Sequence, residues 1–174
     1  HMNRLRLEYE PLRDAMLAVA GQLDPHMGGK GDDMTAPLPP FSHRRTVYGF
    51  IDRQNLPGVL RTFDFASPDT TVGMRHATTT PPQALYLMNN AFVAEQARAF
   101  AGRPDVAGLG DEQRIDRMYR LAYGRPAEPD EVTLALRFLK EAAADPGRGG
   151  PNRLSPWEQY AQVLLATNEF AFVD

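Results

Sequence analysis

Cysteine is absent from this chain of 174 residues. Its absence excludes disulfides, thiolate metal ligands, a cysteine nucleophile and covalent haem attachment through a C-x-x-C-H motif. Lysine is almost absent too, since Lys30 and Lys140 are the only two, and the arginines are scattered along a chain whose formal net charge is −3. Proteins that bind nucleic acid usually present a basic patch. The composition therefore predicts no nucleic-acid partner.

Long apolar runs and hydrolase signatures are also missing. No run of about 18 apolar residues occurs, so we expect no membrane span. The chain contains no G-x-S-x-G motif, and Ser42, Ser67 and Ser155 each fall where a turn or a helix cap explains the residue. Without an evident nucleophile, the sequence favours a protein that is not an enzyme.

The length of the chain suits one domain with its own hydrophobic core, so we predict that residues 1–174 form a single domain. His1 and Met2 have the character of a cloning remnant. A helical pattern begins directly after them, which indicates a piece excised from a larger multidomain protein. Residues 24–42 are rich in glycine and proline, and they predict a long surface loop.

The rest of the pattern predicts a mainly α fold, a compact multi-helix domain. Apolar residues recur at spacings of three and four, as amphipathic helices require. We expect helices over residues 4–22, 81–101, 111–123 and 129–145, a short one over 57–63, and a last one that opens at Ser155 and leads to Phe170. Pro11 either restarts the first helix as a first-turn proline or kinks it, so its firm part should begin near Pro11. In the helix over 81–101, the spacing predicts that Leu85, Met88 and Phe92 face the core.

A minor β element is expected near residues 45–52. Thr46, Val47, Tyr48, Phe50 and Ile51 are β-branched or aromatic, as strand residues tend to be. A single strand needs a neighbour, and the segment 71–77 is the best candidate.

Two helix starts carry the spacing of a capping box. Thr80, Pro81 and Gln83 give one, and Ser155, Pro156 and Glu158 give the other. In such a box the N-cap side chain and the side chain three residues later each accept a hydrogen bond from the other's backbone N–H. We therefore assign structural roles to Thr80, Gln83, Ser155 and Glu158.

Polar residues gather before the first of these boxes, among them Asp64, Asp69, Arg75 and His76. One interpretation makes Arg75 part of an anion site at the start of the helix, suited to a carboxylate or a sugar acid. Pro81 lacks an N–H group, which weakens that site. The other interpretation is structural: Arg75 pairs with Asp64 or Asp69 and locks the loop, because buried arginines are usually paired.

Other candidates for chemistry are few. His76 is a candidate general base that Asp64 would orient, although the sequence supplies no nucleophile for it. Arg44 and Arg45 have the forked donors that bind carboxylate or phosphate, but such a pair also anchors strand ends. The histidines lack the spacing of a zinc site, so we expect no metal.

Six phrases of the chain, in this order and spacing, resemble a known domain family. They are LRDAMLAVAG at 12–21, RRTVY at 44–48, FDF at 63–65, RHATTTPPQAL at 75–85, YRLAYGRP at 119–126 and NEFAFVD at 168–174. The family is the domain of unknown function at the C-terminal end of planctomycete cytochrome-c-associated proteins. The similarity extends over essentially the whole chain.

The resemblance implies a setting more than an activity. Such domains follow a second uncharacterised domain, and often a haem-binding one, in large proteins with the character of exported proteins. It implies an extracytoplasmic or periplasmic location, other domains of the same protein as partners, and haem only in a separate domain. Our leading hypothesis is a non-catalytic accessory or interaction module. The alternative is a domain that binds or hydrolyses carbohydrate or binds an organic acid, with a site around Arg75 and His76.

Overall fold

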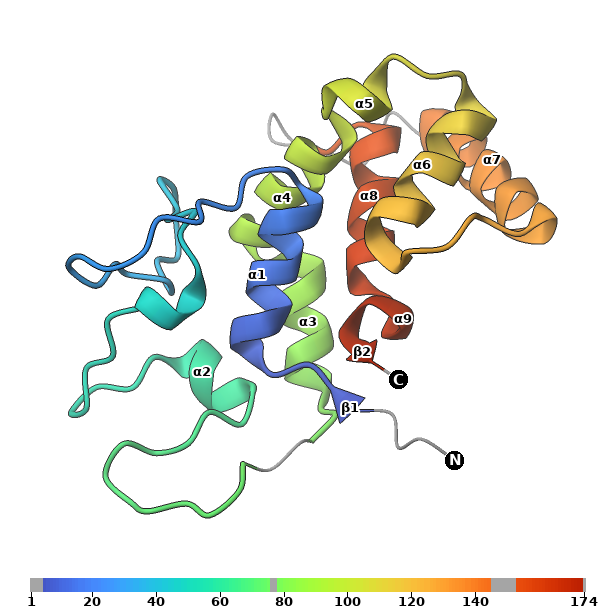
Figure 1. The fold of residues 1–174 in the computed structure, drawn as a ribbon. Coiled ribbons are helices and arrows are strands. Elements are labelled where there is room, and N and C mark those ends of the chain that lie inside the picture. Colours follow the sequence, from blue (N-terminus) through green and yellow to red (C-terminus); the bar gives the residue numbers. More distant parts are fainter. Residues whose placement is uncertain (1–4, 76–77, 145–152, 174) are drawn as a thin grey trace.

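The computed structural model describes residues 5–75, 78–144 and 153–173 (Figure 1). Its helices are α1 (Tyr9–Val19), α2 (Gly58–Thr62), α3 (Pro81–Asn89), α4 (Ala91–Ala101), α5 (Pro104–Ala107), α6 (Asp111–Tyr123), α7 (Pro129–Ala144), α8 (Pro156–Ala166) and α9 (Asn168–Ala171). Two short strands, β1 (Leu5–Arg6) and β2 (Phe172–Val173), complete the list. The predicted mainly α fold is confirmed.

The longer helices form one half of the molecule, and loops with the short α2 form the other (Figure 1). Helix α8 lies at the centre of the helical half, where it contacts α3, α4, α6, α7 and α9. Its closest neighbour is α4. Ala97 and Phe100 of α4 and Ala161 and Leu165 of α8 are all fully buried.

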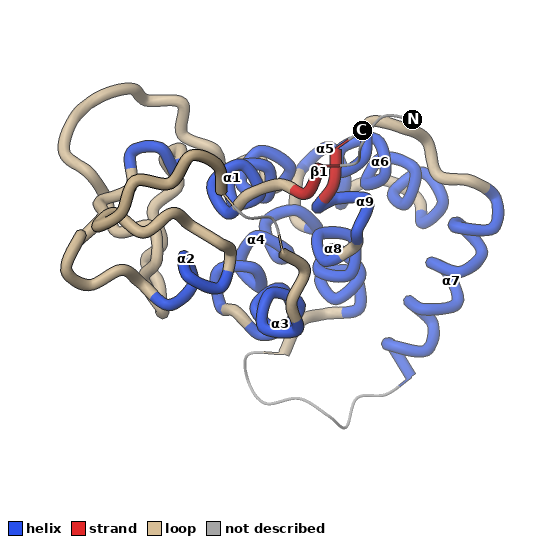
Figure 2. The backbone as a smooth tube through the Cα atoms, turned by 90° about the horizontal axis from the view of Figure 1, so that it is seen from below, coloured by secondary structure: helices blue, strands red, loops and turns tan. Residues whose placement is uncertain are grey.

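The two ends of the described chain meet in the only strand ladder that its residues form. Leu5 pairs with Val173 and Arg6 with Phe172 in antiparallel register (Figure 2). This pairing corrects the helix predicted over 4–22, because β1 occupies its first residues and α1 begins only at Tyr9. Pro11 lies in the first turn of α1, where its missing N–H would have no partner in any case.

The strand predicted near residues 45–52 is wrong. The segment contains a 3-10 turn at Thr46–Tyr48, and its β contacts are limited to isolated bridges such as Asp32 with Gly49. The reason is a contact with α1. The Asp14 carboxylate accepts from both the N–H (2.7 Å) and the hydroxyl (2.6 Å) of Thr46, which turns the backbone toward the helix.

The prediction of a single helix over 81–101 is also wrong, because the helix is interrupted at Asn90. Asn90 has extended backbone angles, and its side chain accepts from the N–H of Phe92 at 2.8 Å, as an N-cap does. Helices α3 and α4 therefore present different faces to the core. Phe92 is buried as expected, but Leu85 and Met88 are 55% and 63% exposed.

Other predicted elements are confirmed close to their bounds. Helix α2 forms within 57–63, and α6 ends at Gly124, whose φ of 72° is the left-handed conformation that glycine favours. Ile115 and Met118 of α6 are fully buried. Residues 24–42 form a loop that crosses the surface of the loop-rich half (Figure 1).

Gln96 of α4 is an exception to the apolar core. Its side chain is fully buried, and neither the oxygen nor the nitrogen of its amide has a hydrogen-bond partner among the described residues. An unpaired buried amide costs about 1–3 kcal/mol. Gln96 therefore lowers the free energy of unfolding.

We predict that Gln96→Met, which keeps an unbranched side chain of the same length and removes both polar atoms, stabilises the fold by about 1–2 kcal/mol. Urea denaturation would measure the change. The control is Gln162→Met, because Gln162 donates to the carbonyls of Leu87 (3.0 Å) and Met88 (2.9 Å) and its loss should destabilise the fold. A destabilised Gln96→Met variant would contradict the prediction.

Candidate functional site

Arg75 is held by the beginning of α1. Its Nη1 donates to Glu8 Oε2 at 2.5 Å and to Glu10 Oε1 at 2.8 Å, and the guanidinium lies 4.5 Å from the centre of the Phe65 ring. Burial by itself lowers the pKa of Arg75, but the hydrogen bonds and charges of Glu10 and Glu8 outweigh it and raise the pKa. The prediction that Arg75 pairs with Asp64 or Asp69 is therefore wrong.

Asp64 closes the loop that leads to α3. It adopts the left-handed conformation with φ 57°, and its Oδ2 accepts from the N–H (2.8 Å) and the hydroxyl (2.7 Å) of Thr78. The carboxylate thus bonds a residue 14 positions away instead of meeting Arg75. His76, the candidate general base, lies outside the described residues.

Gln83 connects three elements at the start of α3. Its Oε1 accepts from the Thr80 N–H at 3.1 Å and from the guanidinium of Arg6, while its Nε2 donates to the Thr62 carbonyl at 2.8 Å. The space that Arg6, Asp64 and Gln83 help to line is about 10 Å³. Such a volume is the size of one water molecule and leaves no room for a sugar or an organic acid.

Arg13 is a buried basic residue that the sequence did not mark as a candidate. It is 2% exposed, donates to the Arg44 carbonyl (3.1 Å), the Thr46 hydroxyl (3.2 Å) and the Ser42 carbonyl, and stacks 4.7 Å from the centre of the Phe92 ring. A signal existed in the sequence. Arg13 lies four residues from both Tyr9 and Leu17, inside the apolar stripe of α1.

Arg44 and Arg45 belong to the same region but make separate contacts. Arg44 donates to the carbonyls of Lys30 (2.9 Å) and Gly28, and its guanidinium lies over the Tyr48 ring. Arg45 is half exposed, with its Nε 3.8 Å from the Asp14 carboxylate. Arg44 therefore fastens the 28–32 loop, and the two arginines form no shared anion site with Arg75.

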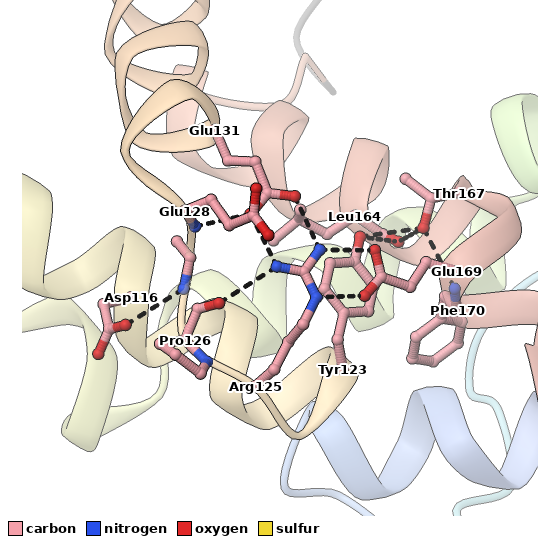
Figure 3. A network of polar contacts seen from close by, with 11 residues as sticks. Asp116, Tyr123, Arg125, Pro126, Glu128, Glu131, Leu164, Thr167, Glu169 and Phe170 are labelled. Atoms are coloured by element: carbon pink, nitrogen blue, oxygen red, sulfur yellow. Dashed lines mark hydrogen bonds and ion pairs between the residues drawn. The ribbon is translucent and has the colours of Figure 1, made fainter.

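A dense polar network surrounds Arg125, between α6 and α7 (Figure 3). The Nε and Nη2 of Arg125 donate to both oxygens of Glu169 at 2.6 and 2.8 Å, and its Nη1 and Nη2 donate to Glu131 at 2.8 and 2.7 Å. The sequence signal for this network was an arginine directly after the helix stop Gly124. The network ties the start of α7 to α9.

Electrostatics in this network favour the charged forms. Hydrogen bonds to Glu131 and Glu169 raise the pKa of Arg125, and the bond from Arg125 lowers the pKa of Glu131. Beside it, the Tyr123 hydroxyl lies 3.1 Å from the Leu164 carbonyl and 2.9 Å from Thr167 Oγ1. The arrangement is a structural clamp, since each carboxylate already bonds the guanidinium.

The second predicted capping box lies at the start of α8. Glu158 donates its N–H to the Ser155 hydroxyl at 3.4 Å, and the Ser155 N–H donates to the Glu158 carboxylate at 2.7 Å.

Within the described ranges, no three His, Asp or Glu side chains come close enough together to hold a metal ion. None of the helices described there has the length and apolar character to cross a membrane.

The fold and these contacts define a mainly α domain in which charged side chains fasten loops to helices. The chain belongs to the family described as a protein of unknown function, DUF1553, also called PSD1, whose model matches residues 1–139. No curated protein and no solved structure matches the chain.

We predict that Arg13→Met destabilises the fold by about 3 kcal/mol, because it leaves buried carbonyl groups of the 42–44 segment without a donor. Denaturation in urea would measure the loss. Arg45→Met is the matched control, since this half-exposed arginine should contribute about 0.5 kcal/mol or less. Equal losses in the two variants would contradict the role of Arg13.

We predict that Arg125→Gln destabilises the fold by about 1 kcal/mol at neutral pH, a modest loss because the pairs are partly exposed. Since the pKa of Glu131 is lowered in the folded state, its contribution is complete above the unfolded pKa and is lost as the pH falls through the folded value. The difference between the wild type and Arg125→Gln should therefore shrink below about pH 4.

Thermal unfolding between neutral and acidic pH would follow this difference. Arg137→Gln removes an exposed pair with Glu141 and is the control, because it should leave the melting temperature unchanged. A difference for Arg125→Gln that grows in acid would show that the network does not act through Glu131.

Proposed function

We propose that this chain is a non-catalytic accessory or interaction module of an exported, haem-associated multidomain protein. One observation carries the proposal. Of the side chains that the sequence marks as candidates for a site, His76 lies outside the described residues, and Asp64, Arg44, Arg45 and Arg75 each contact another part of the same chain. Side chains used in this way fix loops in place, and they are occupied before any ligand arrives.

The resemblance to cytochrome-c-associated proteins supplies the setting of this proposal. Other domains of the full-length protein would be the partners, haem would reside in one of them, and the location would be extracytoplasmic or periplasmic. Membership of a family of unknown function is compatible with this role.

An exposed apolar face on α3 is the surface that we propose for contact with a neighbouring domain. Leu85 and Met88 are three residues apart on one helix and more than half exposed, and Val163 of α8 is 45% exposed. Gln162 donates to the carbonyls of Leu87 and Met88, so α8 lies against the end of α3. Exposed leucine and methionine close together are typical of protein interfaces.

The alternative function, a carbohydrate or organic-acid site around Arg75 and His76, has less support. The space beside Asp64 has the size of one water molecule. Arg75 already binds two carboxylates of its own chain, which would compete with an acidic ligand.

We predict that this chain binds the remainder of its full-length protein, expressed as a separate polypeptide, and that Leu85→Asp with Met88→Asp weakens the complex about tenfold or more. Calorimetric titration would measure the dissociation constant. The control is Leu134→Asp, which changes a leucine on α7 that is also more than half exposed and should leave binding intact. Absence of any complex would overturn the proposed role.

A further inference from the structure

A cavity of about 160 Å³ lies between the start of α1, the segment 46–51 and α2. Its walls are mainly apolar and include Met34, Val47, Phe50, Ile51, Leu60 and Phe65. Val47 and Phe50 are each 67% exposed. The cavity therefore combines a buried apolar wall with an accessible apolar rim.

The volume of this cavity restricts what it can hold. An engineered cavity of about 150 Å³ in another protein stays dry and binds benzene, whereas pockets for drug-sized ligands measure roughly 300–1,000 Å³. The cavity thus fits one aromatic ring or one branched aliphatic group. A nucleotide or an oligosaccharide is too large.

The charge beside the cavity is negative. Glu8 and Glu10 share the single guanidinium of Arg75, which leaves one net negative charge. Glu10 also lines the cavity, and its Oε2 is buried without a hydrogen-bond partner among the described residues. A glutamate carboxylate turns readily about its last torsion. A donor in the cavity can therefore meet one oxygen while Arg75 keeps the other.

We infer that this cavity binds a small amine that carries one aromatic or branched aliphatic group. The apolar group fills the space between Leu60, Ile51 and Phe65, and the ammonium donates to Glu10 in a charge-assisted hydrogen bond. The site goes beyond the proposed interaction role and does not depend on it. It also reverses the preference for acids that Arg75 suggests when it is considered without its partners.

Three probes that share one phenyl ring and differ in charge test this inference. Phenethylamine, ethylbenzene and 3-phenylpropanoate are each titrated at neutral pH into the ¹⁵N-labelled chain, and backbone amide shifts are recorded by NMR. We expect saturable shifts at Thr46, Val47, Gly49 and Ile51 with phenethylamine, about tenfold weaker binding of ethylbenzene, and none of the acid. Equal binding of amine and hydrocarbon would overturn the ligand class, and shifts confined to other residues would overturn the site.

Two matched variants distinguish a direct contact between the amine and Glu10 from a general effect of nearby negative charge. Glu10→Gln keeps an acceptor for Arg75 but removes the charge that lines the cavity, so the preference for phenethylamine over ethylbenzene should fall to about twofold or less. Glu8→Gln removes the other carboxylate on Arg75, which does not line this cavity, and leaves the Glu10 acceptor in place, so it should lower the preference less than Glu10→Gln does. If the two variants lose it equally, the amine responds to general charge and the inference fails.

Discussion

The guanidinium of Arg13 holds the loop-rich half of this molecule against its helices. Between α1 and α3 the buried apolar side chains, such as Leu56, Leu60 and Phe63, join the core of the helices. Polar contacts with α1 then fix the loops between them. Arg13 is buried and donates to Ser42, Arg44 and Thr46. The neighbouring Asp14 accepts from Thr46 as well. Two adjacent residues of α1 therefore hold the segment 42–46 against the helix.

The same dependence on arginine repeats elsewhere in the described chain. Arg44 holds the 28–32 loop, Arg6 donates to Gln83 and Thr78, and Arg75 reaches back to α1. A guanidinium suits this task because its five donors lie in a fixed plane and remain charged. The scarcity of lysine is consistent with a fold in which cations must bond several loop carbonyls at once.

The partners of Arg75 decide the chemistry of the region around it. An arginine before a helix start suggests affinity for acids, but Glu8 and Glu10 exceed its single charge. The adjoining apolar cavity is therefore bordered by a carboxylate, which selects for a cation. The net charge of this region is therefore set by Glu8 and Glu10 together with Arg75, and not by Arg75 alone.

The sequence by itself determined the features that depend on residues three or four positions apart. These are the mainly α fold, the positions of the starts of α3 and α8, and the end of α6 at Gly124, because caps and apolar spacing act within one helical turn. The tertiary structure alone decided which carboxylates Arg75 meets. Arg75 and Glu8 are 67 residues apart, and many carboxylates compete for each guanidinium in a linear chain. It also decided that residues 45–52 form no strand, since Thr46 bonds a helix 32 residues away.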